Sequence, residues 1–302
     1  MPTTGAPLWQ GLFPACVSAF TADGALDLDR TAAHIAWLFD RGADGVVVAG
    51  TTGEFVGMTT DERKALTVAA VDAGAGRGAI IVNTGTYATK ESVELTEHAA
   101  SAGVDGALIV QPYFQRPGRE ELLAHFRAVA EVDVPVMVYN IPSNSAAEAV
   151  RPDDLGALAG EGRVVGVKST LAVPGLVDDI RQKTGSGFSI LYGGISAPLE
   201  GFASGADGWV TGLLNITLDQ ALPLWRAVDT GDGEAARRAW GQIRPLRDLV
   251  RRWLARGYGD VAIYRAILEA MGRDVGVSRL PLQPMAAESK LSLHRELETI
   301  TR

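Results

Sequence analysis

Eight short apolar segments recur through the first two thirds of the chain and are separated by stretches of helix length. They are rich in Val and Ile, and successive residues are apolar, rather than alternate ones. This pattern is typical of strands buried on both faces, as in a parallel sheet. The segments predict strands at residues 12–20, 45–49, 79–83, 107–110, 134–139, 164–168, 188–192 and 208–211.

The intervening stretches carry the periodicity of amphipathic helices. In residues 28–40, apolar side chains recur every three to four positions, which is the period of one helix face. Similar stretches predict helices at 61–73, 91–101, 120–131, 152–159, 174–183 and 197–204. Pro152 and Pro174 suit a first helical turn, and residues 59–62 and 89–91 suit capped helix starts.

One short motif occurs three times where a predicted helix leads into a predicted strand: Gly-x-Asp-Gly at 42–45, 103–106 and 205–208. We expect the first glycine to end the helix in the left-handed conformation. We expect the second to let the chain turn tightly into the sheet. These joints account for part of an unusual glycine content, 35 of 302 residues.

Eight strands alternating with helices favour an α/β fold, a (β/α)8 TIM barrel, over an open doubly wound sheet. After Asp219 the strand pattern stops, and residues 221–252, 261–271 and 286–301 predict helices. We therefore expect a barrel domain at 1–218 and a C-terminal helical extension at 219–302. No Gly/Ser-rich or Pro-rich linker separates the two, so the extension is expected to pack on the barrel.

Charge and composition exclude several classes of protein. The net charge of −8 argues against a nucleic-acid partner, and the arginines between 237 and 256 indicate a solvated helix face or a subunit contact. No apolar run approaches 18 residues, so no membrane span is predicted. Residues 1–10 do not resemble a signal peptide. With a single cysteine, Cys16, we expect a cytoplasmic protein without disulfides.

Lys168 is the strongest candidate for chemistry, because it ends the sixth predicted strand. Strand alternation places Lys168 and Gly166 on the barrel interior and the flanking valines toward the helices. Burial disfavours the charged form of an amine, and a neutral amine can attack a ketone to form a Schiff base. The alternatives are a lysine paired with an acid and one that extends past the strand end to solvent.

Tyr139 ends the fifth predicted strand and should lie beside Lys168 at the barrel mouth. A phenol there can move protons during carbinolamine formation and dehydration, although a single buried tyrosine is commonly structural. Residues 50–54, Gly-Thr-Thr-Gly-Glu, follow the second strand. Their hydroxyls and backbone N–H groups can hold a small carboxylate; the alternative is a turn that only leads into the next helix.

Other candidates are weaker. The glycine-rich stretch 74–78 leads from helix to strand, the wrong context for binding pyrophosphate. Cys16 lies in the first predicted strand and is expected to be a buried apolar residue. The four histidines have no ligand spacing, so no metal site is predicted: His34, His98, His125 and His294.

Three motifs lie at the ends of the second, fifth and sixth predicted strands in this order: Gly50-Thr51-Thr52-Gly53-Glu54, Tyr139-Asn140-Ile141-Pro142 and Gly166-Val167-Lys168. Together they resemble the dihydrodipicolinate synthase / N-acetylneuraminate lyase family of class I aldolases, and the resemblance extends over essentially the whole chain. It implies that Lys168 forms a Schiff base with pyruvate or another 2-oxo acid and that Tyr139 shuttles protons. It implies no metal and no organic cofactor, and a homotetramer built from dimers. The implied substrate-binding residues are Thr51, Thr52, Gly193 and Val210, with Asn144 at a further substrate-binding position. The resemblance also implies that Thr51 and Thr52 link to Tyr139, so that Thr51 counts as a catalytic residue together with Lys168 and Tyr139.

Several positions depart from the family's pattern. Dihydrodipicolinate synthases usually carry an arginine where this chain has Asn144, and an amide cannot make the bidentate contact to a carboxylate. They also place a tyrosine, donated across the dimer, where this chain has Phe114. Residues of the lysine-feedback site and of sialic-acid lyases are absent at four further positions: Thr60, Arg63, Ile195 and Ser196.

These departures leave the second substrate unassigned. We expect a class I aldolase or lyase, or a 2-oxo-acid dehydratase, that acts on pyruvate or a 2-oxo acid with a less anionic aldehyde partner. One alternative is 4-hydroxy-tetrahydrodipicolinate synthase, despite the missing arginine and tyrosine. The alternative from another class is a barrel that binds a 2-oxo acid without turnover.

Overall fold

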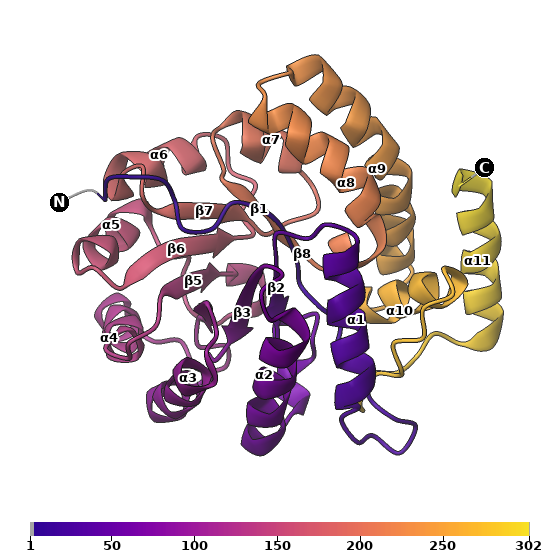
Figure 1. Ribbon diagram of the computed structural model, residues 1–302, viewed down its shortest axis with the longest axis horizontal. Helices are drawn as coiled ribbons and strands as arrows, with labels where there is room; N and C mark the ends of the chain where they lie inside the picture. The colour runs from indigo at the N-terminus through magenta and orange to yellow at the C-terminus, as the bar shows by residue number, and fades with distance from the viewer. Residues whose placement is uncertain (1–2, 302) are drawn as a thin grey trace.

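The computed structural model describes residues 3–301, and its eight parallel strands form one sheet that curls into a barrel (Figure 1). Hydrogen-bonded neighbours run in the order β1-β8-β7-β6-β5-β4-β3-β2. Between β1 and β2 the seam is bridged by Ala15 and Val47. The predicted (β/α)8 barrel is confirmed, with strands β1 Gly11–Pro14, β2 Gly45–Val48, β3 Ala79–Asn83, β4 Gly106–Val110, β5 Val136–Asn140, β6 Val164–Ser169, β7 Ser189–Tyr192 and β8 Gly208–Thr211.

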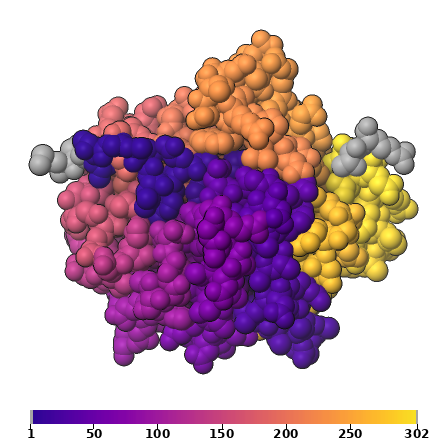
Figure 2. All heavy atoms as spheres, in the orientation of Figure 1, coloured from indigo at the N-terminus to yellow at the C-terminus, as the bar shows by residue number. Residues whose placement is uncertain are grey.

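Helices surround the barrel, and the last three gather along one side of it (Figures 1 and 2). The barrel helices are α1 Leu28–Asp40, α2 Thr60–Gly74, α3 Thr89–Ala102, α4 Arg119–Ala130, α5 Pro152–Gly160, α6 Leu176–Thr184, α7 Pro198–Ala203 and α8 Leu214–Asp229. The C-terminal helices are α9 Gly233–Ala255, α10 Asp260–Ala270 and α11 Ala287–Thr301, and short 3-10 turns lie at Phe55–Gly57 and Pro142–Asn144. Of the helices described, none has the length and apolarity needed to cross a membrane.

The C-terminal helices pack on the barrel through α8. Helix α9 packs along α8, α10 contacts both α8 and α9, and α11 contacts α9 and α10. Residues 218 and 219, between which the sequence places the end of the barrel, both lie inside α8. The eighth barrel helix therefore also carries the extension.

Some predicted element boundaries are wrong for local reasons. The single helix predicted at 221–252 is two helices, because Gly231 has a φ of 71° and Asp232 caps α9. The first strand ends at Pro14, since the amides of Val17 and Ala19 bond to side chains instead of a neighbouring strand.

Two predicted helix starts are also wrong. Pro174 precedes α6 rather than entering its first turn, because Gly175 at φ 78° is the N-cap. Thr89 does not cap α3, since it is already helical and its hydroxyl contacts His125 Nδ1 at 2.9 Å. Thr59, in contrast, caps α2 through a reciprocal pair of contacts with Glu62, as the sequence predicts.

The three helix-to-strand joints share one backbone conformation. The first glycine of each has a positive φ, as predicted: 89° at Gly42, 86° at Gly103 and 86° at Gly205. The packing around the second glycine leaves no space for a side chain, since a Cβ on Gly45 would lie 2.4 Å from Phe13 Cε1. The corresponding glycines at 106 and 208 are equally crowded by Trp9 and by the backbone of Gly11.

The aspartate of each joint has a role that the sequence did not reveal. Its carboxylate accepts a hydrogen bond from a backbone N–H of the preceding strand in the sheet and so adds one rung to the ladder. The bonds are Leu12 N to Asp44 Oδ2 at 2.8 Å, Ile80 N to Asp105 Oδ2 at 2.8 Å, and Ile190 N to Asp207 Oδ2 at 2.7 Å. At three places on the N-terminal face of the barrel, the repeated motif therefore satisfies a strand N–H group.

Candidate active site

Lys168 and Tyr139 lie side by side on adjacent strands at the C-terminal face of the barrel. The two residues are register partners between β5 and β6. The Lys168 Nζ lies 3.9 Å from the centroid of the Tyr139 ring, and both side chains are buried. The predicted proximity of the two side chains is confirmed.

The Lys168 ammonium faces an aromatic ring instead of an acid. Within residues 3–301 it has no salt bridge within 4.0 Å and no hydrogen bond, so no acid is directly paired with it, and Asp260 acts on it only at longer range. Only 3% of the residue is exposed, so it does not extend to solvent either. A lysine that is buried without an acidic partner is an uncommon arrangement for a structural residue.

Two glycines shape the space around Lys168. Gly166 lies on the same face of β6, and a Cβ there would come within 3.0 Å of Ser189 O. A Cβ on Gly193 would lie 3.1 Å from Lys168 Cγ and 3.2 Å from Lys168 Cε. Gly193, one of the predicted substrate-binding residues, therefore lies against the alkyl chain of Lys168.

The loop after β2 presents unpaired backbone donors. Within the described chain, the amide N–H groups of Thr51, Thr52 and Gly53 take part in no hydrogen bond, whereas Glu54 N donates to Thr51 O at 3.0 Å. The side chain of Thr52 is buried and that of Thr51 is exposed. Successive free N–H groups in a turn form a concavity suited to an anion.

The same loop is flanked by backbone in an unfavourable conformation. Ala49 has a φ of 53° and Glu54 a φ of 59°, and they are the only non-glycine residues with positive φ among residues 3–301. Such conformations persist where the surrounding structure enforces them, and they gather at functional sites. No hydrogen bond joins either threonine hydroxyl to Tyr139 in the described residues.

Helix α10 contributes residues to this site that sequence reasoning missed. A Cβ on Gly212, just after β8, would lie 2.7 Å from Thr52 Oγ1 and 2.8 Å from Tyr264 Cε2. Tyr264 and Thr52 thus enclose the same small space. Burial raises the pKa of the Asp260 carboxyl above its usual range, while the charge of Lys168 acts to lower it. No sequence motif marks these residues, because only the fold brings α10 to the barrel mouth.

The remaining predicted positions lie in β8 and in the loops after β1, β4 and β5. Val210 is fully buried in β8. Asn144 is exposed in a 3-10 turn after β5, where its Oδ1 accepts a hydrogen bond from the Ser143 hydroxyl at 2.8 Å. Phe114 is 82% exposed in the loop after β4. Cys16 is buried as predicted, and burial raises the pKa of its thiol.

The histidines serve separate structural contacts. His34 Nε2 lies 2.8 Å from Asn215 Oδ1, and burial lowers the pKa of this imidazole to about 4. Over residues 3–301, no group of three or more His, Cys, Asp or Glu side chains could hold a metal ion.

The fold and this geometry together define a (β/α)8-barrel protein with a buried lysine and tyrosine at the C-terminal ends of its strands. Comparison with known proteins makes the assignment specific. A sequence model described as the Dihydrodipicolinate synthetase family matches residues 8–300. The chain therefore belongs to the dihydrodipicolinate synthetase family, whose members are carbon–carbon lyases of the class I aldolase type.

Individual relatives support this membership along the whole chain. The 4-hydroxy-tetrahydrodipicolinate synthase of Mycolicibacterium paratuberculosis is 36% identical over 293 residues, covering 95% of each chain. Dihydrodipicolinate synthase of Aquifex aeolicus superposes with a TM-score of 0.90 at 31% identity, over 97% of this chain and 98% of that one. The prophage protein YagE of E. coli K12, solved in complex with pyruvate, has a TM-score of 0.89 at 26% identity, over 97% and 99%.

Proposed function

We propose that the chain is a pyruvate-dependent aldolase or lyase that works through a Schiff base on Lys168. The observation that carries this proposal is the buried Lys168 amine, without an acidic partner, 3.9 Å from the Tyr139 ring centroid. A class I aldolase needs an amine nucleophile and a nearby proton carrier. The two side chains supply both.

In the proposed reaction the Lys168 amine attacks the C2 carbonyl carbon of pyruvate or another 2-oxo acid. The carbinolamine loses water, with the Tyr139 hydroxyl passing protons to and from the oxygen that leaves. The resulting iminium withdraws electrons, so C3 can lose a proton to give an enamine. The enamine carbon then attacks an aldehyde, and water releases the product from Lys168. The iminium serves as the electron sink, so the scheme uses no metal and no organic cofactor.

The loop at residues 50–54 is proposed to bind the carboxylate of the 2-oxo acid. Support comes from the unpaired N–H groups of Thr51, Thr52 and Gly53 and from the hydroxyls of the two threonines. Gly193 and Val210 would flank the bound 2-oxo acid from β7 and β8. The choice of ligand is supported by YagE, a protein of the same family whose crystal structure is a complex with pyruvate.

The second substrate is proposed to be an aldehyde that lacks a carboxylate. Asn144 offers no positive charge. An anionic aldehyde would therefore meet no compensating arginine at this position. We expect Asn144→Arg to raise kcat/KM for aspartate semialdehyde more than for a neutral aldehyde of similar length. An equal change for both aldehydes would contradict this charge argument.

A second candidate is 4-hydroxy-tetrahydrodipicolinate synthase, the name shared by curated relatives at 34% to 36% identity. Turnover of aspartate semialdehyde and pyruvate by the unmodified protein would favour it over the neutral-aldehyde proposal. We also propose that the chain assembles as a homotetramer of dimers. The exposed Phe114 ring at the barrel mouth supports a contact there between copies, and sedimentation measurements would test it.

Borohydride reduction with pyruvate, followed by intact mass measurement, tests the central step. We expect a stable adduct in the wild type and in Lys90→Ala, whose lysine is exposed on α3, and none in Lys168→Ala. An unmodified wild type at saturating pyruvate would refute the Schiff-base mechanism. An adduct without turnover of any aldehyde or 2-oxo acid would indicate the non-catalytic binding alternative.

A further inference from the structure

The C-terminal extension reaches the proposed carboxylate loop through one buried arginine. Arg265 lies on α10, and its Nη2 donates to Glu54 Oε1 at 2.6 Å. The side chains are 7% and 3% exposed, respectively. Burying two charges is costly unless other hydrogen bonds satisfy them, and such pairs are retained where they specify a conformation. Glu54 directly follows Gly53, so this ion pair fixes one end of the loop.

The guanidinium of Arg265 holds three separate segments together. In addition to Glu54, Nη2 donates to Ser18 O at 2.6 Å, just beyond β1. Its other nitrogens donate to Val275 O and to Ser278 Oγ, both in the segment between α10 and α11. Arg265 thereby joins the loop after β1, the loop after β2 and the C-terminal segment.

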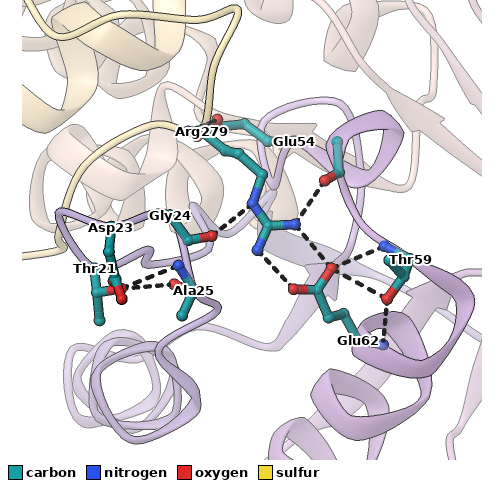
Figure 3. Close-up of polar contacts among 9 residues, drawn as sticks. Thr21, Asp23, Gly24, Ala25, Glu54, Thr59, Glu62 and Arg279 are labelled. Carbon is teal, nitrogen blue, oxygen red and sulfur yellow. Dashed lines mark hydrogen bonds and ion pairs between the residues drawn. The ribbon is translucent and has the colours of Figure 1, made fainter.

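The second oxygen of Glu54 is also held by the C-terminal segment. Arg279 N donates to Glu54 Oε2 at 3.1 Å. The Arg279 side chain reaches between the loop that contains Gly24 and the first turn of α2, as Figure 3 shows, and donates to Gly24 O at 2.8 Å and to both carboxylate oxygens of Glu62. Both Glu54 oxygens are therefore fixed by residues that lie more than 200 positions further along the chain.

Backbone strain explains what this network does. Glu54 has a left-handed φ of 59° despite its side chain, a conformation that needs outside contacts to persist. Loss of the contacts from Arg265 would let Glu54 relax and would displace the preceding N–H groups. Tyr264, next to Arg265, faces Thr52 across Gly212. Helix α10 thus borders the middle of the loop through Tyr264 and holds its end through Arg265.

We propose that Arg265 is a positioning residue for the carboxylate loop, acting through Glu54, and that the C-terminal extension thereby sets affinity for the 2-oxo acid. The meaning of a change in affinity rests on the proposed function, whereas the effect on the loop itself does not. Arg265→Lys keeps the charge and loses the planar fork that reaches several acceptors at once.

The matched control is Arg181→Lys. Arg181 also bridges backbone carbonyls and a carboxylate, donating to Phe188 O and to Asp207 Oδ2 at 2.6 Å each. It lies at the end of α6, on the opposite face of the barrel from residues 50–54. A substitution there loses similar contacts without touching the loop.

The experiment combines steady-state kinetics with amide hydrogen exchange of the loop at Glu54 and Phe55, whose N–H groups donate to Thr51 O at 3.0 Å and to Gly50 O at 3.4 Å. We expect Arg265→Lys to raise KM for pyruvate about tenfold with kcat nearly unchanged, as for a loss of uniform binding, and to speed exchange in the loop. Arg181→Lys should lower the melting temperature comparably while leaving KM and loop exchange at wild-type values. Wild-type KM and loop exchange in Arg265→Lys would overturn the proposal.

A substitute variant and a second criterion cover the cases in which Arg265→Lys does not fold or pyruvate forms no adduct. If Arg265→Lys does not fold, Glu54→Gln replaces it under the same criteria, because the amide has nearly the same shape and lacks the charge. If the wild type forms no adduct with pyruvate, the proposed function fails. Loop exchange then decides the role of Arg265 by itself, with faster exchange in Arg265→Lys than in Arg181→Lys supporting the proposal and equal exchange refuting it.

Discussion

Gly193→Ala perturbs the proposed nucleophile without removing any functional group. The new Cβ would lie 3.1 Å from Lys168 Cγ, 3.2 Å from Lys168 Cε and 3.1 Å from Thr170 Cγ2. Carbon atoms pack comfortably at about 3.5–4.0 Å, so the lysine chain must move by roughly 0.5 Å. The φ of Gly193 is not positive, so the backbone itself accepts alanine.

A displacement of that size predicts a loss of rate with the fold retained. Because a misplacement of about 1 Å can cost on the order of 10²-fold in rate, we expect adduct formation with pyruvate to slow roughly tenfold. Overpacking should also cost about 1–3 kcal/mol of stability. Borohydride reduction at successive times after mixing with saturating pyruvate measures the rate of adduct formation, and thermal unfolding measures the stability.

A matched glycine separates the two effects. A Cβ on Gly156 would lie 3.0 Å from Lys183 Cβ and 3.0 Å from Lys183 O, between α5 and α6 on the outside of the barrel. Gly156→Ala should lose comparable stability and keep the wild-type rate. If Gly193→Ala traps pyruvate as fast as the wild type while it is destabilised like Gly156→Ala, the position of Lys168 does not limit the reaction.

Three other substitutions test separate parts of the structure. Tyr139→Phe should slow turnover on the order of 10²-fold through loss of a proton carrier, with unchanged thermal unfolding; near-normal turnover would make Tyr139 structural. Burial lowers the pKa of His34 from 6.5 to about 4, so the unfolded chain binds a proton that the folded chain excludes. The stability that depends on neutral His34 is present above pH 6.5 and falls by about 3 kcal/mol as the pH drops toward 4. His34→Gln should flatten this decline in urea unfolding at pH 4.5 and 7, and parallel declines in both proteins would refute it. Gly241 lies inside α9, and a Cβ added there would have no neighbouring atom within 4 Å, so Gly241→Ala should raise the free energy of unfolding by about 1 kcal/mol; an unchanged or lower melting temperature would contradict this.

The central pair of residues could be predicted because strand geometry is regular. In β6 the side chains alternate, so Lys168 and Gly166 had to share the inner face once residues 164–168 were identified as a strand. Register then placed Tyr139 beside Lys168, because parallel strands end at the same face of the barrel. Both inferences used only local pattern and the order of the strands.

The conformation of the carboxylate loop could not be predicted in the same way. The positive φ values fall on Ala49 and Glu54, which no pattern in the sequence marks. Gly53 is needed for space, since a Cβ there would lie 3.1 Å from Ser18 Oγ and 3.2 Å from Cys16 O. Glu54 can be strained because Arg265 holds it, and that contact spans 211 residues of sequence.

The distribution of strain along the barrel indicates its functional end without reference to any relative. At the N-terminal face, positive φ falls on glycines such as Gly42 and Gly205, where it costs little, and aspartates satisfy the strand ends. At the C-terminal face, positive φ falls on glycines such as Gly175 but also on two non-glycine residues, Ala49 and Glu54, and three consecutive N–H groups between these two lack partners within the described residues. Selection for stability alone would favour glycine at both positions and a loop whose N–H groups are all hydrogen-bonded. The strain at this face therefore supports the proposed anion site, and the buried ion pair from α10 holds Glu54 in its strained conformation.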